Sequence, residues 1–95
     1  MREQFDRKKL KRLAKKHGIV RMSVFGSHAR GEARKGSDLD LLVKFKSTRK
    51  LSLFGFAGVQ IDFEDQLHIP VDLVMEGTLY PRIKPYVEKE AIRVV

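Results

Sequence analysis

The chain has 95 residues, of which 42% are hydrophobic and 34% are charged, a balance typical of a globular domain and not of a disordered one. We expect one domain spanning residues 1–95, because this length suits one modest core. The sequence has no cysteine, which excludes a disulfide framework and a thiolate metal site.

The net charge and the hydropathy of the chain indicate which binding partners and which cellular location to expect. The 20 Lys and Arg residues outnumber the 12 Asp and Glu residues and give a net charge of +8, which favours polyanions such as nucleotides, nucleic acid or an acidic protein. No apolar run approaches the roughly 20 residues of a membrane-spanning helix. No apolar leader follows Met1. We therefore expect a cytoplasmic protein that does not enter a membrane.

The first predicted element is a helix over residues 4–17. Its apolar residues recur at helical spacing on one face, and Gly18 is a natural stop. The opposite face is basic and carries Arg7, Lys8, Lys11, Arg12, Lys15 and Lys16. A solvated surface is the preferred interpretation of such a face, and a polyanion-binding surface is the alternative. Residues 19–25, β-branched and aromatic, predict the first strand.

A turn, a short helix and a second strand follow. Gly26 breaks the strand, and residues 27–33 predict a short helix with Ser27 in the capping position. Residues 34–37 form a turn before a strand over residues 38–45. Alternation along that strand places Leu39, Leu41 and Val43 on one face and Asp38, Asp40 and Leu42 on the other.

The second half of the chain predicts a helix over residues 51–67, a strand over 71–75, a turn at Gly77, a helical turn over 85–90 and a last strand over 91–95. The predicted apolar set of the long helix is Leu53, Phe54, Ala57, Ile61 and Leu67. Helices and strands that alternate in this way indicate an α/β fold, with three central strands covered by helices.

Two aspartates on one strand are the first chemical signal. Asp38 and Asp40 lie two residues apart, so they share a face at roughly 7 Å. Neighbouring carboxylates repel each other, and a bound cation relieves that repulsion. Magnesium prefers carboxylate, phosphate and water oxygens. Asp72, alone in an apolar strand, would bring a third carboxylate if its strand lay beside the first, and could take a proton from an attacking hydroxyl. Alone, an Asp-x-Asp pair is a weak signal.

The Gly26–Ser27 turn is the second chemical signal. Glycine lets a ligand approach the backbone closely, and a helix that starts there points free N–H groups at it, which favours phosphate. The Ser27 hydroxyl adds a donor, and Arg30, one turn on, could reach the same phosphate. An ordinary capped turn with Arg30 in solvent is the simpler alternative.

Together these segments resemble a known signature. It reads Gly26-Ser27-x-Ala29-Arg30-Gly31, five further residues, then Ser37-Asp38-x-Asp40-Leu41-x-Val43, with an acid on a later strand. The pattern is similar to that of the DNA polymerase beta-type nucleotidyltransferase superfamily. Within it, the short chain resembles the minimal nucleotidyltransferases (MNT). The resemblance implies the small nucleotidyltransferase fold, a mixed sheet of three or four strands flanked by helices.

The resemblance also implies roles. Gly26 and Ser27 would hold the β- and γ-phosphates of a nucleoside triphosphate, with help from Arg30. The implied catalytic and metal-binding residues are Asp38, Asp40 and Asp72. They would bind two Mg²⁺ ions, with Asp72 also acting as the base. The implied reaction transfers a nucleoside monophosphate, AMP from ATP, to a hydroxyl and releases pyrophosphate.

Members of this family commonly pair with a HEPN-domain toxin, for which the minimal nucleotidyltransferase is an antitoxin. The resemblance therefore implies a HEPN partner whose hydroxyl accepts AMP, and a homo- or hetero-oligomer. One alternative is a non-catalytic antitoxin that acts by binding. Another is a transferase that modifies RNA ends, which is not favoured because the chain has no Trp and two Tyr for base stacking. His28, inside the motif, is expected at the surface.

Overall fold

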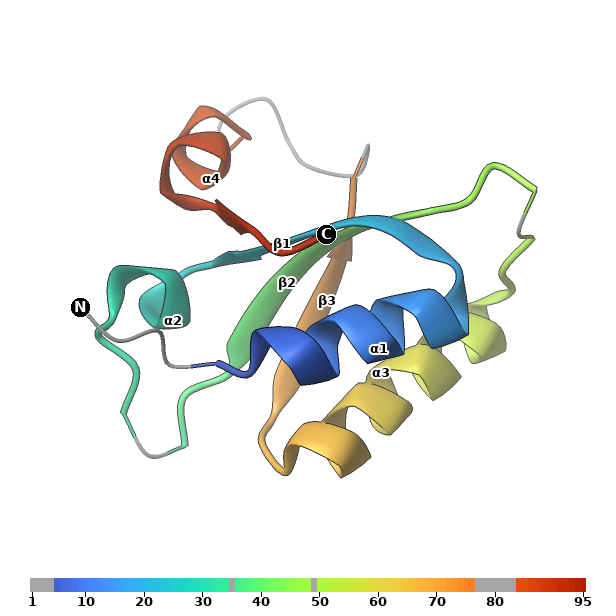
Figure 1. Ribbon diagram of the computed structural model, residues 1–95, viewed down its shortest axis with the longest axis horizontal. Helices are drawn as coiled ribbons and strands as arrows, with labels where there is room; N and C mark the ends of the chain where they lie inside the picture. Colours follow the sequence, from blue (N-terminus) through green and yellow to red (C-terminus); the bar gives the residue numbers. More distant parts are fainter. Residues whose placement is uncertain (1–4, 35, 49, 77–83) are drawn as a thin grey trace.

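The computed structural model describes residues 5–34, 36–48, 50–76 and 84–95. The turn predicted at Gly77 lies outside these residues. Four strands form one sheet in the order β3-β2-β1-β4, and the long helices α1 and α3 lie side by side over one face of it (Figure 1). In the described ranges, no helix has the length and apolarity needed to cross a membrane.

The sheet is mixed. Strand β1 (Ile19–Phe25) pairs antiparallel with β2 (Leu39–Phe45) on one side and with the short β4 (Ile92–Arg93) on the other. Strand β3 (Val71–Met75) pairs parallel with β2. The strands predicted at residues 19–25 and 71–75 are confirmed, and β2 begins one residue later than predicted, after Asp38. The last strand is shorter than predicted.

Helix α1 (Arg7–His17) confirms the first predicted helix but begins three residues later. The Asp6 side chain sets this start, because it accepts a hydrogen bond from the Lys9 backbone N–H at 3.1 Å. Gly18 ends the helix in the left-handed conformation, as predicted. Leu10, Leu13 and Ala14 are buried against the sheet.

Helix α2 (Ser27–Arg30) is shorter than predicted. Gly31, at φ 72°, ends it, and the Gly31 N–H turns back toward the His28 carbonyl. Only a residue that tolerates positive φ stops a helix in this way without strain. The predicted cap is also wrong, because Gly26 occupies the N-cap position and no side chain caps the helix.

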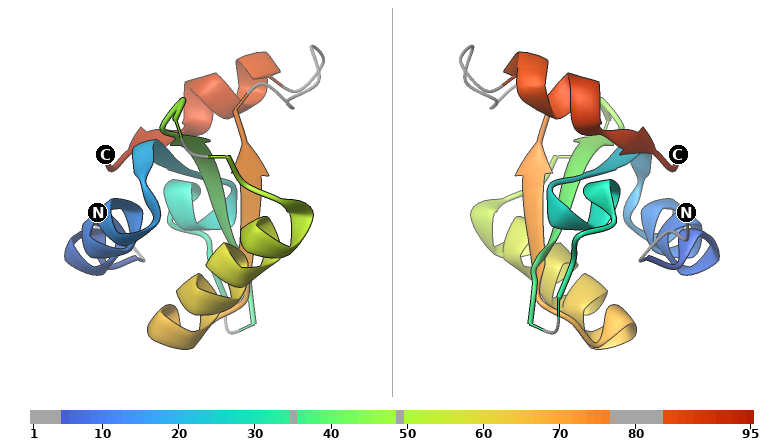
Figure 2. Two further views of the ribbon diagram at one scale, coloured as in Figure 1. Left: turned by 90° about the vertical axis from the view of Figure 1, so that its right-hand side faces the viewer. Right: turned by 90° about the vertical axis from the view of Figure 1, so that its left-hand side faces the viewer.

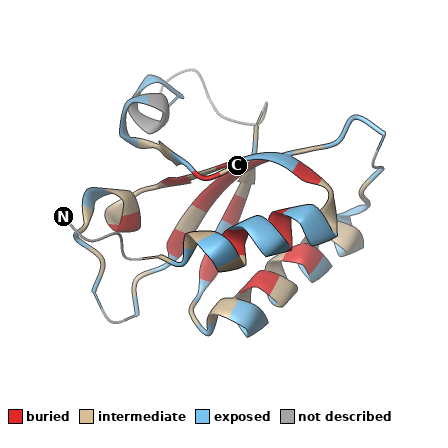
Figure 3. Ribbon diagram, viewed as in Figure 1, coloured by how far each residue is buried: buried red, intermediate tan, exposed pale blue. Residues whose placement is uncertain are grey.

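Helix α3 (Leu53–Leu67) begins after Ser52, whose hydroxyl accepts from the Gly55 N–H at 3.0 Å. The predicted apolar face is wrong except at Leu67, which is partly buried and packs against the core. Leu53, Phe54 and Ile61 are 83%, 89% and 57% exposed, whereas Val59 and Phe63 are buried (Figure 3). Apolar residues spread over more than half of the circumference of this helix, so spacing alone does not select the buried face, and packing against β3 and α1 decides it.

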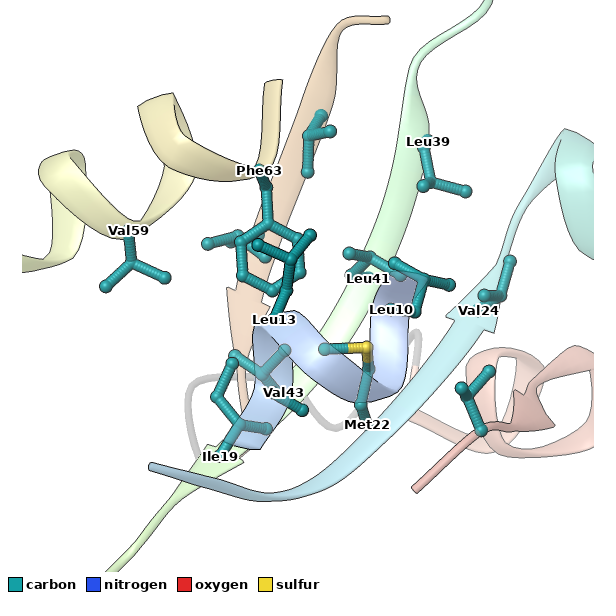
Figure 4. Close-up of a cluster of buried hydrophobic side chains, with 14 residues drawn as sticks. Leu10, Leu13, Ile19, Met22, Val24, Leu39, Leu41, Val43, Val59 and Phe63 are labelled. Atoms are coloured by element: carbon teal, nitrogen blue, oxygen red, sulfur yellow. The ribbon is translucent and has the colours of Figure 1, made fainter. Parts of the chain in front are cut away.

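The core lies between the α1–α3 layer and the sheet. Figure 4 shows side chains of α1, α3 and the strands meeting there. Its buried members are Leu10, Leu13, Ala14, Ile19, Met22, Val24, Leu39, Leu41, Val43, Val59, Phe63, Val71, Leu73 and Val94. The face of β2 predicted to be apolar is therefore the core face, which leaves Asp40 on the other side.

Helix α4 (Lys84–Glu90) confirms the predicted C-terminal helical turn and starts one residue earlier. It leads directly into β4, so its end lies at the end of β1 where α2 begins (Figure 2). The backbone beyond β4 stays attached to β1, since the Val94 N–H donates to the Met22 carbonyl at 2.8 Å. The chain end thus completes the sheet on the β1 side.

Two substitutions in α3 test the packing. Phe63→Ala should destabilise the fold by about 3–5 kcal/mol, because it leaves a cavity in the core. Ile61→Ala, two residues away and exposed, should cost less than about 0.5 kcal/mol. Chemical denaturation measures both changes. Equal losses for the two variants would contradict this placement of α3.

Candidate active site

Three chain segments meet at one end of the sheet. β1 runs into Gly26 and Ser27 there, and the antiparallel β2 starts there, with Asp38 just before the strand and Asp40 at its second position. β3 is parallel to β2, so its first residues, with Asp72, start at the same end. Helix α2 packs against β1 and β2 beside these carboxylates (Figure 2). The structure thus brings the predicted segments together.

Asp40 is the centre of this arrangement. It is the register partner of Asp72 on β3 and of Phe25 on β1. It is half-buried, whereas Asp38 and Asp72 are exposed. Burial raises the pKa of Asp40 above its ordinary value, and the negative charges of Asp72 and then Asp38 raise it further. The condition set for Asp72 is met, because its strand lies beside the strand of Asp40, whereas Asp38 lies just before β2.

Gly26 lies directly against the Asp40 carboxylate. Its φ is 74° and its ψ is −152°, a conformation that is essentially restricted to glycine. A Cβ atom built on Gly26 would overlap Oδ2 of Asp40 and lie 3.3 Å from its Cγ. The glycine therefore makes room for a carboxylate of the protein itself, in addition to any ligand.

Ser27 opens α2 with a partly exposed side chain that caps no helix. Its backbone carbonyl accepts from the Glu32 N–H at 2.8 Å, which folds the residues after Arg30 back over the turn. The structure thus fixes the Gly26–Ser27 backbone without using the hydroxyl as a cap.

His28 is buried, at 7% exposure, so its expected surface position is wrong. It lies in α2, which packs against β1 and β2. Nδ1 is buried and has no hydrogen-bond partner among the described residues, so it carries the desolvation cost of an unsatisfied polar atom. A protonated ring would lower the pKa of Asp40, against the larger effect of burial.

Arg30 projects from the end of α2 into two ion pairs. Its Nε donates to Glu32 at 3.3 Å, and its Nη1 donates to Glu90 of α4 at 3.0 Å. The predicted alternatives were a phosphate contact and free exposure to solvent. The guanidinium is half-exposed, yet both ion pairs fix its place.

The donor chemistry of the site fits Mg²⁺. In the described part of the chain, no three His, Asp or Glu side chains stand close enough to enclose a metal ion. Mg²⁺ does not need such a cage, because it binds through one or two carboxylates with phosphate and water oxygens. Asp40 and Asp72 are paired by the strand register, and burial and then the repulsion from Asp72 raise the pKa of Asp40. A cation between them would remove that cost.

The comparisons with known proteins agree with this geometry. A family model described as a nucleotidyltransferase domain matches residues 6–94, so the chain belongs to that family. The protein adenylyltransferase MntA of Thermococcus cleftensis is 38% identical over 84 residues, which cover 88% of this chain and 83% of that protein. The predicted enzyme class and family are confirmed.

Two solved structures are similar in fold. One, provisionally assigned as a minimal nucleotidyltransferase, is 42% identical with a TM-score of 0.73, over 96% of this chain and 98% of that one. The other is a tri-AMPylated HEPN toxin of Shewanella oneidensis in complex with its MNT antitoxin. It matches at 17% identity with a TM-score of 0.73, over 99% of this chain and 72% of that one. The predicted small nucleotidyltransferase fold is confirmed.

Sequence reasoning missed two features of this site. The burial of His28 had a signal, since α2 follows the strand directly and its first turn must pack on the sheet. Glu90 had no signal, because 60 positions separate it from Arg30 and its contact depends on the pairing of β4 with β1.

Glycine substitutions test the approach of Gly26 to Asp40. Gly36→Ala should cost about 1–2 kcal/mol, because φ is 88° there but no atom lies within 4 Å of the new Cβ. Gly26→Ala should cost more, since its Cβ also displaces the Asp40 carboxylate. Denaturant titration measures both. A smaller loss for Gly26→Ala than for Gly36→Ala would contradict the contact.

Asp40→Asn should raise the melting temperature at neutral pH, because the amide has no charge to bury or to repel Asp72. The folded-state pKa of Asp40 is raised above 3.8, so its contribution to stability is full below that value and is lost as the pH rises through the folded pKa. The advantage of the variant should therefore appear as pH rises and vanish in acid.

Thermal denaturation across this range checks the prediction for Asp40. Asp65→Asn, at an exposed aspartate of α3, is the matched control and should show no such gain. A lower melting temperature for Asp40→Asn at neutral pH would contradict the repulsion.

Proposed function

We propose that this chain is a magnesium-dependent nucleotidyltransferase that transfers AMP from ATP to a hydroxyl group of a partner protein. The observation that carries the proposal is the position of Asp40. The strand register sets it beside Asp72, and the Gly26 turn lies directly against its carboxylate. Phosphoryl-group transfer needs this juxtaposition of a phosphate-binding turn and carboxylates.

In this proposal the Gly26–Ser27 turn binds the β- and γ-phosphates, and Arg30 assists. Asp38, Asp40 and Asp72 hold Mg²⁺, which neutralises phosphate charge when bound. Asp72 accepts the proton of the acceptor hydroxyl. The hydroxyl oxygen then forms a bond to the α-phosphorus, and the bond between that phosphorus and the bridging oxygen breaks. Pyrophosphate leaves with the electron pair.

The acceptor we propose is a HEPN-domain toxin, with this chain as its antitoxin. Support comes from the relative named a protein adenylyltransferase and from the similar fold seen beside an AMPylated HEPN toxin. Leu53 and Phe54, exposed at the start of α3, give the chain an apolar surface that suits contact with a protein. We expect the chain to form one domain, to reside in the cytoplasm and to assemble with such a partner.

A non-catalytic antitoxin is the second candidate, and the same exposed Leu53 and Phe54 favour it. In that case the chain would neutralise its partner by contact alone. Modification of RNA ends has less support, because the chain has no Trp and two Tyr on which bases could stack.

The test is incubation of the purified chain with Mg²⁺, α-labelled ATP and the protein encoded next to it, followed by mass spectrometry. We expect the neighbour to gain one or more AMP units. Asp38→Asn and Asp40→Asn should lower the rate by more than about 100-fold, since a metal ligand contributes several kcal/mol to transfer. Asp65→Asn, away from the site, should leave the rate unchanged.

Two outcomes separate the candidates. A stable complex without any AMP gain would favour the binding module. Full activity of both Asp38→Asn and Asp40→Asn would reject the proposed site.

A further inference from the structure

One contact of the site has no role in the proposed function so far, and it joins Arg30 to the C-terminal helix α4. Glu90 Oε2 accepts from Arg30 Nη1 at 3.0 Å, and Glu32 Oε2 accepts from Arg30 Nε at 3.3 Å. One carboxylate comes from the loop just after α2, and the other comes from the last residue of α4. Two separate parts of the chain therefore hold one guanidinium.

The sheet brings Glu90 to this place. Ile92 pairs with Val24 in the antiparallel register between β4 and β1. Glu90 precedes Ile92 by two residues, so it stands at the end of β1, level with the Gly26 turn. The rigid pairing of two strands thus fixes the carboxylate relative to the predicted phosphate-binding turn.

The two ion pairs leave part of the guanidinium available. Arginine carries five N–H donors in one plane, and the contacts with Glu32 and Glu90 occupy one on Nε and one on Nη1. Within the described residues, Nη2 of Arg30 has no hydrogen-bond partner. A guanidinium held in one plane with free donors is prepared for a phosphate oxygen.

We propose that Glu90 is a positioning residue for nucleotide binding, which orients Arg30 toward the phosphates of the triphosphate. This inference rests on the proposed function. The C-terminal helix thereby contributes to the nucleotide site without touching the nucleotide. An ordered Arg30 loses less freedom when the phosphate binds, so the complex is tighter. The ion pair itself is exposed and contributes little to folding.

The experiment is calorimetric titration of the full chain, without an acceptor protein, with α,β-methylene-ATP, whose α–β bridge the proposed transfer cannot break, in the presence of Mg²⁺. Glu90→Gln keeps the shape of the side chain and removes its charge. We expect it to weaken binding by about 3- to 10-fold, the factor that corresponds to the ordering of one long side chain. Its melting temperature should stay close to that of the unaltered chain.

The matched control is a second exposed ion pair of the same kind. Arg21 Nη1 donates to Glu76 at 3.0 Å, away from the turn, and Glu76→Gln should leave the affinity unchanged. Arg30→Ala supplies the other control. Adding Glu90→Gln to Arg30→Ala should cause no further loss, because Glu90 acts through Arg30.

Three results would overturn the inference. Equal or tighter binding by Glu90→Gln would show that the carboxylate is neutral or competes with phosphate. A further loss on top of Arg30→Ala would show that Glu90 acts on something else. In both cases binding by the unaltered chain leaves the proposed function intact. No binding by the unaltered chain would reject the proposed function and this inference together.

Discussion

The parallel pairing of β2 with β3 is the constraint on which the candidate site depends. It sets Asp40 level with Asp72 at the end of the sheet, although their like charges oppose this. Buried side chains on the other face of the same strands hold the register. Leu39 and Leu41 of β2 pack beside Val71 and Leu73 of β3. A slip of one residue would expose those side chains, so burial of the core maintains the repulsion.

The site therefore stores an electrostatic cost that the hydrophobic core offsets. Asp40 is half-buried between Asp72 and the Gly26 turn, and the described structure gives it no ion pair. A bound cation or proton stabilises a carboxylate that is half-buried beside another carboxylate, and such carboxylates are typical of functional sites. The same environment that raises the pKa of Asp40 makes it a suitable ligand for Mg²⁺.

The turn that faces Asp40 is formed by residues 26–31, and the C-terminal segment of the chain contacts it through Glu90. Gly26 and Gly31 bracket the four residues of α2 with positive φ, which keeps the helix short and close to the sheet. The C-terminal segment adds β4 to the other side of β1, and this pairing delivers Glu90 to Arg30. The predicted phosphate-binding residues thus belong to a local motif, while the orientation of one of them depends on a contact across the fold.

The sequence by itself determined the strands β1, β2 and β3, the buried face of β2 and the motif residues, because alternation along Asp38–Val43 and the glycines at 26 and 31 act locally. It also predicted the class of fold and the family. Only the tertiary structure decided which face of α3 is buried, since its apolar residues cover more than one face and packing against β3 and α1 selects Val59 and Phe63. The same holds for the burial of His28 and the contact of Glu90 with Arg30. The burial of His28 and the contact of Glu90 with Arg30 depend on which strands are neighbours in the sheet, and the spacing of residues along the chain does not reveal that.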